Sequence, residues 1–278
     1  MIALREKLMR AVFLAAALAS ILAIVLICLF LFANGLPAIG KIGVGEFLLG
    51  RIWKPVDIPP KFGIFPMVVG SLYVTAGAIL LGVPVGIFTA VFLAKLCPKR
   101  LYKLLKPAVE LLAGIPSVVY GFFGMAAIVP HLRSSVLSAC ILLGIMILPT
   151  VIGMTESALR AVPEQYYEGA LALGAGKYRS LFFVVVPAAK SGMLAAVVLG
   201  IGRAVGETMA VIMVAGNQAR MPTSAFRGVR TLTANIVLEM GYAADLHREA
   251  LIATGVVLFV FVLLINLSFS ALKRRGRP

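Results

Sequence analysis

The segment MVVGSLYVTAGAILLGVPVGIFTAVFLA, from Met67 to Ala94, contains no charged side chain over 28 residues. An α-helix rises about 1.5 Å per residue, so about 20 apolar residues cross the hydrocarbon core of a bilayer. The segment is long enough for a membrane-spanning helix, and its extra length should make it tilt, bend or project. Pro84 within it removes a backbone donor and should disturb one turn. This segment predicts a membrane protein built from helices.

Five further apolar segments flank this one. The complete set of expected spans covers residues 11–33, 67–94, 107–129, 136–159, 181–215 and 251–272. The first is too long for the apolar region of a signal peptide, which has about 7–15 residues, so we expect it to be retained. The fifth exceeds what a bilayer requires, and Pro116 should disturb the third. The sequence therefore predicts an all-α, polytopic membrane protein with six transmembrane helices and a single domain over residues 1–278.

The composition supports a membrane protein and excludes several other classes. Hydrophobic residues make up 61% of the chain, only 13% are charged, and the mean hydropathy is +1.04. Soluble domains contain about 45–50% apolar residues. The net charge of +15 does not predict a nucleic-acid partner, because the basic residues cluster beside apolar segments without interleaved aromatic residues. The cysteines and histidines lack metal-ligand or nucleophile spacing, so we expect no metal, no cofactor and no catalytic centre.

The distribution of Lys and Arg indicates how the spans are oriented. With both ends of the chain on one side, that side carries fifteen Lys and Arg residues and the other carries nine over longer loops. The richer side includes the cluster at 95–106 and the C-terminal residues Lys273, Arg274, Arg275 and Arg277. Cytoplasmic loops carry the excess of positive charge, so we expect both termini in the cytoplasm. The first and third loops on the other side are long enough to form short helices.

The loop between the fourth and fifth spans contains VPEQYYEGALALGAGKYRSLFFVVVPAA, from Val162 to Ala189. Its apolar spacing predicts a short amphipathic helix that ends at Gly174, since glycine is the residue most often found just after a helix C-terminus. From the pattern alone, this helix could be an ordinary connector on the membrane surface or a docking element for another protein.

The same loop resembles the EAA motif of ABC importer permeases. In that motif Glu-Ala-Ala is followed after three residues by Gly, and after nine more by Ile-x-Leu-Pro. The matching positions are Glu168, Gly169, Ala170, Gly174, Val184, Val186 and Pro187. The spacing is intact, and the departures keep small or apolar residues. The resemblance implies a type I ABC importer permease fold, with a core over about 65–272 and a coupling helix within about 160–180 that docks on an ATPase subunit.

The expected fifth span contains LGIGRAVGETMAVIMVAGN, from Leu199 to Asn217, with Arg203 and Glu207 far from any loop. Residues four apart can meet on one face of a helix. A charge at the centre of a membrane is costly, so such residues face a polar cavity or each other. Arg203 could bind a passing anion, with Glu207 holding it in place, or the two could form a salt bridge that joins helices. Gly202 and Gly206 should also permit close approach of a partner helix.

The segment GRAVGETMAV, followed by GN, resembles permeases of the phosphate-specific ABC transporter, of the PstC type. Supporting segments are GIPSVVYGFFG at 114–124 and RTLTANIVLEMGYA at 230–243. The resemblance implies that Arg203 and Glu207 lie on the path of phosphate. From the residues themselves, glycines and Pro116 in 114–124 predict packing and a kink, and Glu110 and Glu156 predict bracing near the ends of spans.

The resemblance also implies a set of partners. These are a second permease subunit in a heterodimer, two ATPase subunits, an extracytoplasmic phosphate-binding protein and inorganic phosphate, in the inner membrane of a bacterium. Two alternatives stay open at this point. One is a permease of the same superfamily for another oxyanion, such as molybdate or sulfate. The other is a secondary transporter or channel that works without ATP, for which the spaced loop motif would be unnecessary.

Overall fold

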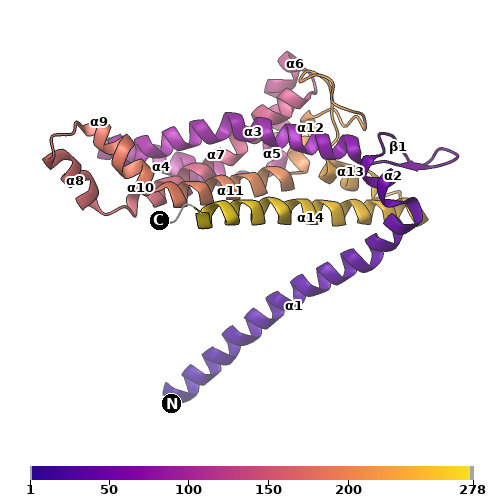
Figure 1. Cartoon of the computed structure of the whole chain (residues 1–278), viewed down its shortest axis with the longest axis horizontal. Coiled ribbons are helices and arrows are strands. Elements are labelled where there is room, and N and C mark those ends of the chain that lie inside the picture. The colour runs from indigo at the N-terminus through magenta and orange to yellow at the C-terminus, as the bar shows by residue number, and fades with distance from the viewer. Residues whose placement is uncertain (1, 276–278) are drawn as a thin grey trace.

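The computed structural model describes residues 2–275, which form an elongated body of helices that run mostly along its long axis (Figure 1). Helices α8 and α9 lie at one end of this body, together with the C-terminal end of α14. The β-hairpin, α2 and α13 lie toward the other end. We call these the α8 end and the α13 end. Arg277, which contributed to the expected charge asymmetry, lies outside the described residues.

The elements follow one another as helices with one small hairpin, and η denotes a π-helical turn. They are α1 (Ile2–Ile42), α2 (Val44–Leu49), β1 (Trp53–Lys54), β2 (Lys61–Phe62), α3 (Phe65–Val91), η1 (Phe92–Leu96), α4 (Lys99–Gly114), α5 (Ser117–Phe123), η2 (Gly124–Ile128), α6 (Val129–Leu132), α7 (Val136–Arg160), α8 (Glu164–Ala172), α9 (Lys177–Ser180), η3 (Leu181–Val185), α10 (Val186–Ala188), α11 (Lys190–Gly206), α12 (Met209–Val214), α13 (Leu232–Glu239) and α14 (Asp245–Arg275). Strands β1 and β2 pair antiparallel, with Trp53 opposite Phe62.

Four helices are long and apolar enough to cross a membrane, and two bent pairs bring the number to six. The straight spans are Arg5–Ile42, Phe65–Leu96, Val136–Arg160 and Asp245–Ser268. The pair Lys99–Gly114 and Ser117–Leu132 is bent by 99°, and the pair Lys177–Ala188 and Lys190–Gly206 by 67°. With each pair counted as one span, the described residues agree with the six predicted spans.

The two prolines expected to disturb spans behave differently. Pro116 lies at the 99° bend between α4 and α5, as predicted. Pro84 lies inside α3, which runs through it as one helix, so the disturbance expected there is absent. The backbone group that a proline leaves unpaired in a membrane helix can be satisfied by small local adjustments, and the helix then continues.

The centre of the body is the contact between α3 and α7. Two-thirds of the membrane-spanning stretch of α7 is buried within the chain (67%), which makes it the central helix. The helices approach closely at Gly82, where a Cβ atom would lie 2.6 Å from the Gly144 carbonyl oxygen. Only a glycine allows that separation. Buried aliphatic residues of α7, including Leu142, Leu143 and Met146, form the largest apolar cluster together with residues of α5 and α12.

Helix α1 contacts the body with only one of its halves. Its second half packs on α14, where a Cβ at Gly35 would lie 2.6 Å from Val256, and the rings of Phe32 and Phe259 meet edge to face. Its first half diverges from the body (Figure 1), and its large apolar side chains from Leu8 to Phe30 are exposed. The short helices expected in the longer loops are present as α2 and α13.

Candidate functional site

The fifth expected span, 181–215, bends by 67° near Ala189 and is broken again at Glu207. Helix α11 ends at Gly206, Glu207 has an extended backbone (φ −71°, ψ 131°), and α12 begins at Met209. The prediction that Arg203 and Glu207 meet on one helix face is therefore wrong, because the helix ends between them. Among the described residues, no ion pair joins the two side chains.

The Glu207 carboxylate instead serves the start of α12. Its Oε1 accepts hydrogen bonds from the backbone N–H groups of Thr208 and Ala210, each at 3.2 Å. The first N–H groups of a helix have no partner within it, so a carboxylate at this place satisfies them and interacts favourably with the helix dipole. Glu207 thus stabilises the break and leaves the guanidinium of Arg203 without a carboxylate.

Arg203 lies in the last turn of α11 and is half-buried. Its Nε is buried and has no hydrogen-bond partner among the described residues. A cation is favoured near a helix C-terminus by the dipole, which explains how the site tolerates the charge. Buried donors nearly always have a partner, and the described residues supply none to this Nε. An acceptor from outside the chain would meet the exposed part of the half-buried side chain.

Thr233 holds the break from the side. Its hydroxyl donates to the Glu207 carbonyl oxygen at 3.2 Å, and its Oγ1 lies 3.1 Å from Oγ1 of Thr231. The N–H of Leu232 donates to Ser71 of α3 at 3.0 Å, which anchors the start of α13. The sequence analysis missed Thr233. A hydroxyl residue in an apolar segment was the available signal, but nothing in the sequence pairs it with Glu207.

Helices α5 and η2 pack closely on α12. A Cβ at Gly121 would lie 2.4 Å from Sδ of Met213, and one at Gly124 would lie 2.7 Å from Val214. These glycines are packing residues, as predicted. The close approach expected at Gly202 and Gly206 does not occur with any described part of this chain, because no atom would lie within 4 Å of an added Cβ. That face of α11 is open.

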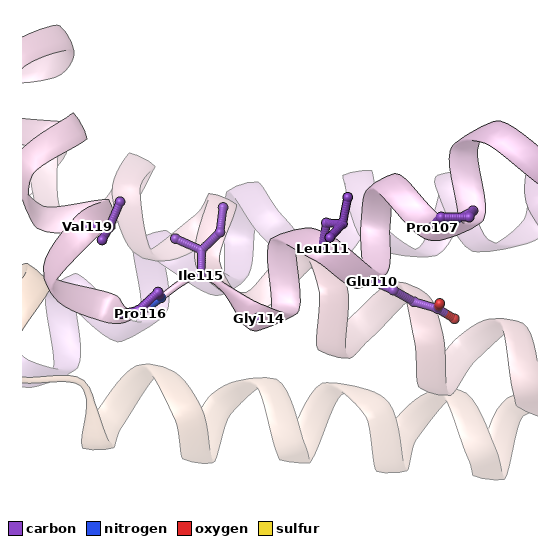
Figure 2. Close-up of a pocket in the computed structure, with 7 residues that line it drawn as sticks. All are labelled: Pro107, Glu110, Leu111, Gly114, Ile115, Pro116 and Val119. Carbon is purple, nitrogen blue, oxygen red and sulfur yellow. The ribbon is translucent and has the colours of Figure 1, made fainter.

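The elbow between α4 and α5 carries a groove of about 580 Å³. Its lining residues are Pro107, Glu110, Leu111, Gly114, Ile115, Pro116 and Val119 (Figure 2). Tyr120 braces the elbow, because its buried hydroxyl donates to the Leu112 carbonyl at 2.9 Å. The groove is mainly apolar and its one charged lining residue is an acid, so it offers no cation to an anion.

The loop after α7 forms the expected short helix. In α8 the N–H of Gly174 donates to the Leu171 carbonyl at 2.9 Å, and that of Ala175 to the Ala170 carbonyl at 3.1 Å. This is the Schellman arrangement, in which the residue after the C-cap has a left-handed backbone, and Gly174 has φ +86°. The prediction of a helix that stops at Gly174 is confirmed.

Helix α8 stands at the end of the body with its far side uncovered. Glu168 and Gly169 are exposed and Ala170 is half-buried, whereas Pro187 lies apart from them at the start of α10. Apolar side chains nearby are exposed as well, and Leu173 retains 91% of its accessible area. A salt bridge of 2.9 Å between Lys95 of η1 and Glu164 fixes the start of the helix. The exposed face has the spaced apolar side chains that helix-in-groove docking uses.

A buried carboxylate lies in the last turns of α7. Glu156 of α7 is only 2% exposed and accepts hydrogen bonds from Tyr102 (2.8 Å), Lys106 (2.9 Å) and Arg160 (2.8 Å). Arg160 also donates to the Leu93 carbonyl of η1 at 3.2 Å. Glu156 therefore joins α4, α7 and η1, which is the bracing role predicted for it. Glu110 is exposed and contacts only Lys106, at 3.6 Å.

A second buried carboxylate braces the α13 end and was not foreseen. Glu239 is 6% exposed and accepts from Trp53 at 2.8 Å and from Arg230, and it lies 2.9 Å from Nε2 of His247. Arg230 also donates to the Asn217 carbonyl at 3.0 Å. Glu239 thus joins the hairpin, α13, α14 and the loop that follows α12.

Residues 82–278 match the family described as the binding-protein-dependent transport system inner membrane component. A relative named probable ABC transporter permease protein YqgH, from Bacillus subtilis, is 40% identical over 91% of this chain and 87% of its own. The phosphate transport system permease protein PstC of Mesorhizobium japonicum is 36% identical over 89% of this chain and 84% of its own. The match therefore extends over nearly the whole length of both chains.

Solved structures show the same fold at lower identity. A chain from a bacterial ABC transporter involved in the import of alginate is 17% identical, with a TM-score of 0.66 over 99% of both chains. A chain of the MetNI methionine ABC transporter in an inward-facing conformation is 21% identical, with a TM-score of 0.60 over 75% of this chain and 94% of that one. The chain has the fold of ABC importer permeases and belongs to the family of binding-protein-dependent transport system inner membrane components, among the permeases of the PstC type.

Proposed function

We propose that this chain is one of the two permease subunits of an ATP-driven phosphate importer. The observation that carries the proposal is Arg203, a half-buried guanidinium whose Nε has no hydrogen-bond partner among the described residues, next to a break in a membrane helix. The PstC relatives, 36% and 32% identical to this chain, are named as phosphate transport permeases, which supports phosphate as the solute. A second permease subunit completes the path, and residues 1–278 act as one permease domain.

The break supplies the geometry that an anion path needs. Irregular backbone is tolerated at membrane depth where it is buried in protein or lines a polar cavity, and transporters place substrate sites at such broken helices. Arg203 lies one turn from the break, and the adjacent Gly202 and Gly206 leave that face of α11 open within this chain. A guanidinium offers paired donors that match phosphate oxygens, and it stays charged at every physiological pH.

In this proposal Glu207 does not pair directly with Arg203. By capping α12 it keeps the helix broken, and so keeps Arg203 at the end of α11 with its charge uncompensated. One arginine without a surrounding cage binds an anion weakly. Weak binding suits transport, because a solute that enters must also leave.

The α8 end faces the cytoplasm in this proposal, and so do both termini. Two ATPase subunits engage the complex there, with the exposed helix α8 of this chain docked in a groove of one of them. The docking element consists of Glu168, Gly169, Ala170 and Gly174, and the segment that follows it ends at Pro187. ATP hydrolysis takes place in the ATPase subunits. A phosphate-binding protein delivers the solute at the α13 end.

Uptake by the complete complex in sealed vesicles tests the proposal. We expect radiolabelled phosphate to accumulate only with ATP on the α8 side and the binding protein on the other. An excess of unlabelled phosphate should abolish accumulation, whereas sulfate and molybdate should not. Accumulation of sulfate or molybdate instead would identify a permease for another oxyanion, and accumulation without ATP would identify a secondary transporter.

A further inference from the structure

The α13 end carries a protrusion built from two segments far apart in the sequence. Residues 131–137 run from the end of α6 into the start of α7, and residues 216–230 follow α12. Two backbone hydrogen bonds join these segments: Val136 N–H to the Arg227 carbonyl (3.0 Å) and Leu137 N–H to the Ala225 carbonyl (2.9 Å). The Ser135 N–H donates to the carbonyl of Val214, at the end of α12 (3.1 Å). Figure 1 shows the two segments together beside α6. They form one surface, which we call the outer protrusion.

The outer protrusion is strongly basic. Residues 131–137 and 216–230 contain four arginines and one histidine but no Asp or Glu. Arg230 is paired with Glu239. The other three, Arg133, Arg220 and Arg227, are exposed and have no carboxylate within 4 Å among the described residues. At the same end Lys41 and Lys54 are paired with Glu249 and Asp57, whereas Arg51, Lys61 and Arg248 have no carboxylate within 4 Å among the described residues but lie outside the protrusion.

The protrusion is also held in a fixed shape. Arg133 has φ +59°, a conformation that favours glycine or asparagine. Its N–H donates to the Val129 carbonyl at 2.7 Å, and its own carbonyl accepts from Ser138 at 2.6 Å. The backbone conformation therefore does not favour arginine at this position. A binding role for the side chain would explain why arginine is present. Phe226, next to Arg227, is 61% exposed.

We propose that the arginine patch formed by Arg133, Arg220 and Arg227 is the docking surface for a carboxylate-rich face of the solute-binding protein. Arginine and aromatic residues are enriched at protein interfaces, and an uncompensated patch speeds encounter with a partner of opposite charge. Arg220 and Arg227 lie in the segment that follows α12, the helix that begins at the break at Glu207, so a protein docked there would contact the segment connected to the break. The proposal depends on the orientation proposed above, but not on which solute is carried.

A free anion fits this patch less well than a protein surface. The three guanidinium groups are exposed, so water would strongly screen their attraction for a small ion. A fixed surface assembled from two segments presents its charges in a constant pattern, which a folded partner can match.

The experiment measures how the complex's own binding protein, loaded with its solute, stimulates ATP hydrolysis by the complex in lipid nanodiscs. The variants are Arg133→Gln with Arg227→Gln, and Arg133→Glu with Arg227→Glu. The matched control is Arg248→Gln, an exposed arginine at the same end but on α14. Size-exclusion chromatography of each complex establishes that it has assembled.

We expect the KM for the binding protein to rise about 3- to 10-fold in the double Gln variant and further in the double Glu variant, with kcat unchanged. The difference should shrink between about 0.05 M and about 0.5 M salt, because salt screens exposed charges. Arg248→Gln should behave as the parent. An unchanged KM overturns the proposal. So does a loss of kcat alone, which would place the patch in the anion path, or an effect that follows anionic lipid content, which would make it a lipid site.

Labelling with a membrane-impermeant maleimide separates this proposal from the orientation on which it depends. Arg227→Cys should be labelled from outside sealed cells above the level of the parent chain. Labelling only after the membrane is opened would overturn the orientation, and the docking surface with it. Labelling from outside, with KM unchanged in the double variants, would overturn the docking surface alone.

Discussion

The hydroxyl of Thr233 donates a hydrogen bond to the carbonyl oxygen of Glu207, 3.2 Å away, where the fifth span is broken. The two residues belong to different segments, and Glu207 also caps α12 with its side chain. One residue thus satisfies the start of a helix through its carboxylate and is held by α13 through its carbonyl. Specific hydrogen bonds therefore stabilise the break, which distinguishes it from a frayed helix end.

Removal of the Thr233 hydroxyl should loosen this break. We expect Thr233→Val to reduce phosphate uptake about 5- to 10-fold, since an unpaired buried carbonyl costs about 1–3 kcal/mol and Glu207 would shift to find a donor. Thr233→Ser keeps the hydroxyl and should retain most of the activity. The measurement is the initial rate of uptake at equal amounts of assembled complex. Equal rates in the Val and Ser variants would show that the hydrogen bond does not matter to transport.

Loss of the charge at Arg203 should stop transport without unfolding the chain. Arg203→Gln should reduce uptake at least 100-fold, because the amide offers no charge to a passing anion, while the complex still assembles. Arg203→Lys restores the charge but not the paired donors, so intermediate uptake is expected. Scintillation counting of vesicles measures uptake, and chromatography measures assembly. Normal uptake by Arg203→Gln would remove Arg203 from the path.

Gly174 should be intolerant of a side chain, in contrast to Gly176. At φ +86° a Cβ strains the backbone by about 1–2 kcal/mol, so Gly174→Val should weaken the end of α8 and the binding of ATPase subunits. Gly176 has φ −68° and free space around it, so Gly176→Val is a matched control in the same loop. Co-purification of the ATPase subunit measures the effect. Equal losses in both variants would mean that bulk, rather than the helix end, is responsible.

Glu156 should matter to stability far more than Glu110. Glu156→Gln leaves Lys106 and Arg160 without their buried carboxylate, and we expect a loss of about 2 kcal/mol in the free energy of unfolding. Glu110→Gln removes one exposed contact and should cost less than about 0.5 kcal/mol. Thermal unfolding of the two variants in the same detergent compares them. A midpoint for Glu156→Gln no lower than that for Glu110→Gln would contradict the bracing role.

The spans, the short loop helices and the end of α8 could all be predicted because each depends on local signals. An apolar segment of sufficient length, such as Met67–Ala94, crosses a bilayer whatever surrounds it. Gly174 ends a helix because of its own backbone freedom. The bracing role of Glu156 was predictable for a related reason, since an acid near the end of a span needs a cation and Arg160 lies four residues away in the sequence.

The geometry at Arg203 and Glu207 was not predictable, because it depends on contacts between segments. Spacing alone predicted that the two residues share one helix face. In the structure the Glu207 carboxylate instead accepts a hydrogen bond from the start of α12, and its carbonyl oxygen accepts one from the hydroxyl of Thr233. The Glu239 network was missed for a related reason: Arg230 and His247 lie within nine residues of Glu239, but Trp53, which completes the network, lies 186 residues away.

The sequence by itself determined that this chain lies in a membrane, how many times it crosses, and which loop carries the short exposed helix α8. These properties follow from apolar length, charge placement and local backbone preference, each of which acts over a few tens of residues at most. Only the tertiary structure decided where the fifth span breaks, that the Nε of Arg203 has no partner among the described residues, and that three arginines share one surface. Each of these depends on which residues, distant in the sequence, lie next to a given polar group in the folded chain. Hydrogen bonds between such groups are strong in a low-dielectric interior and so fix the local geometry.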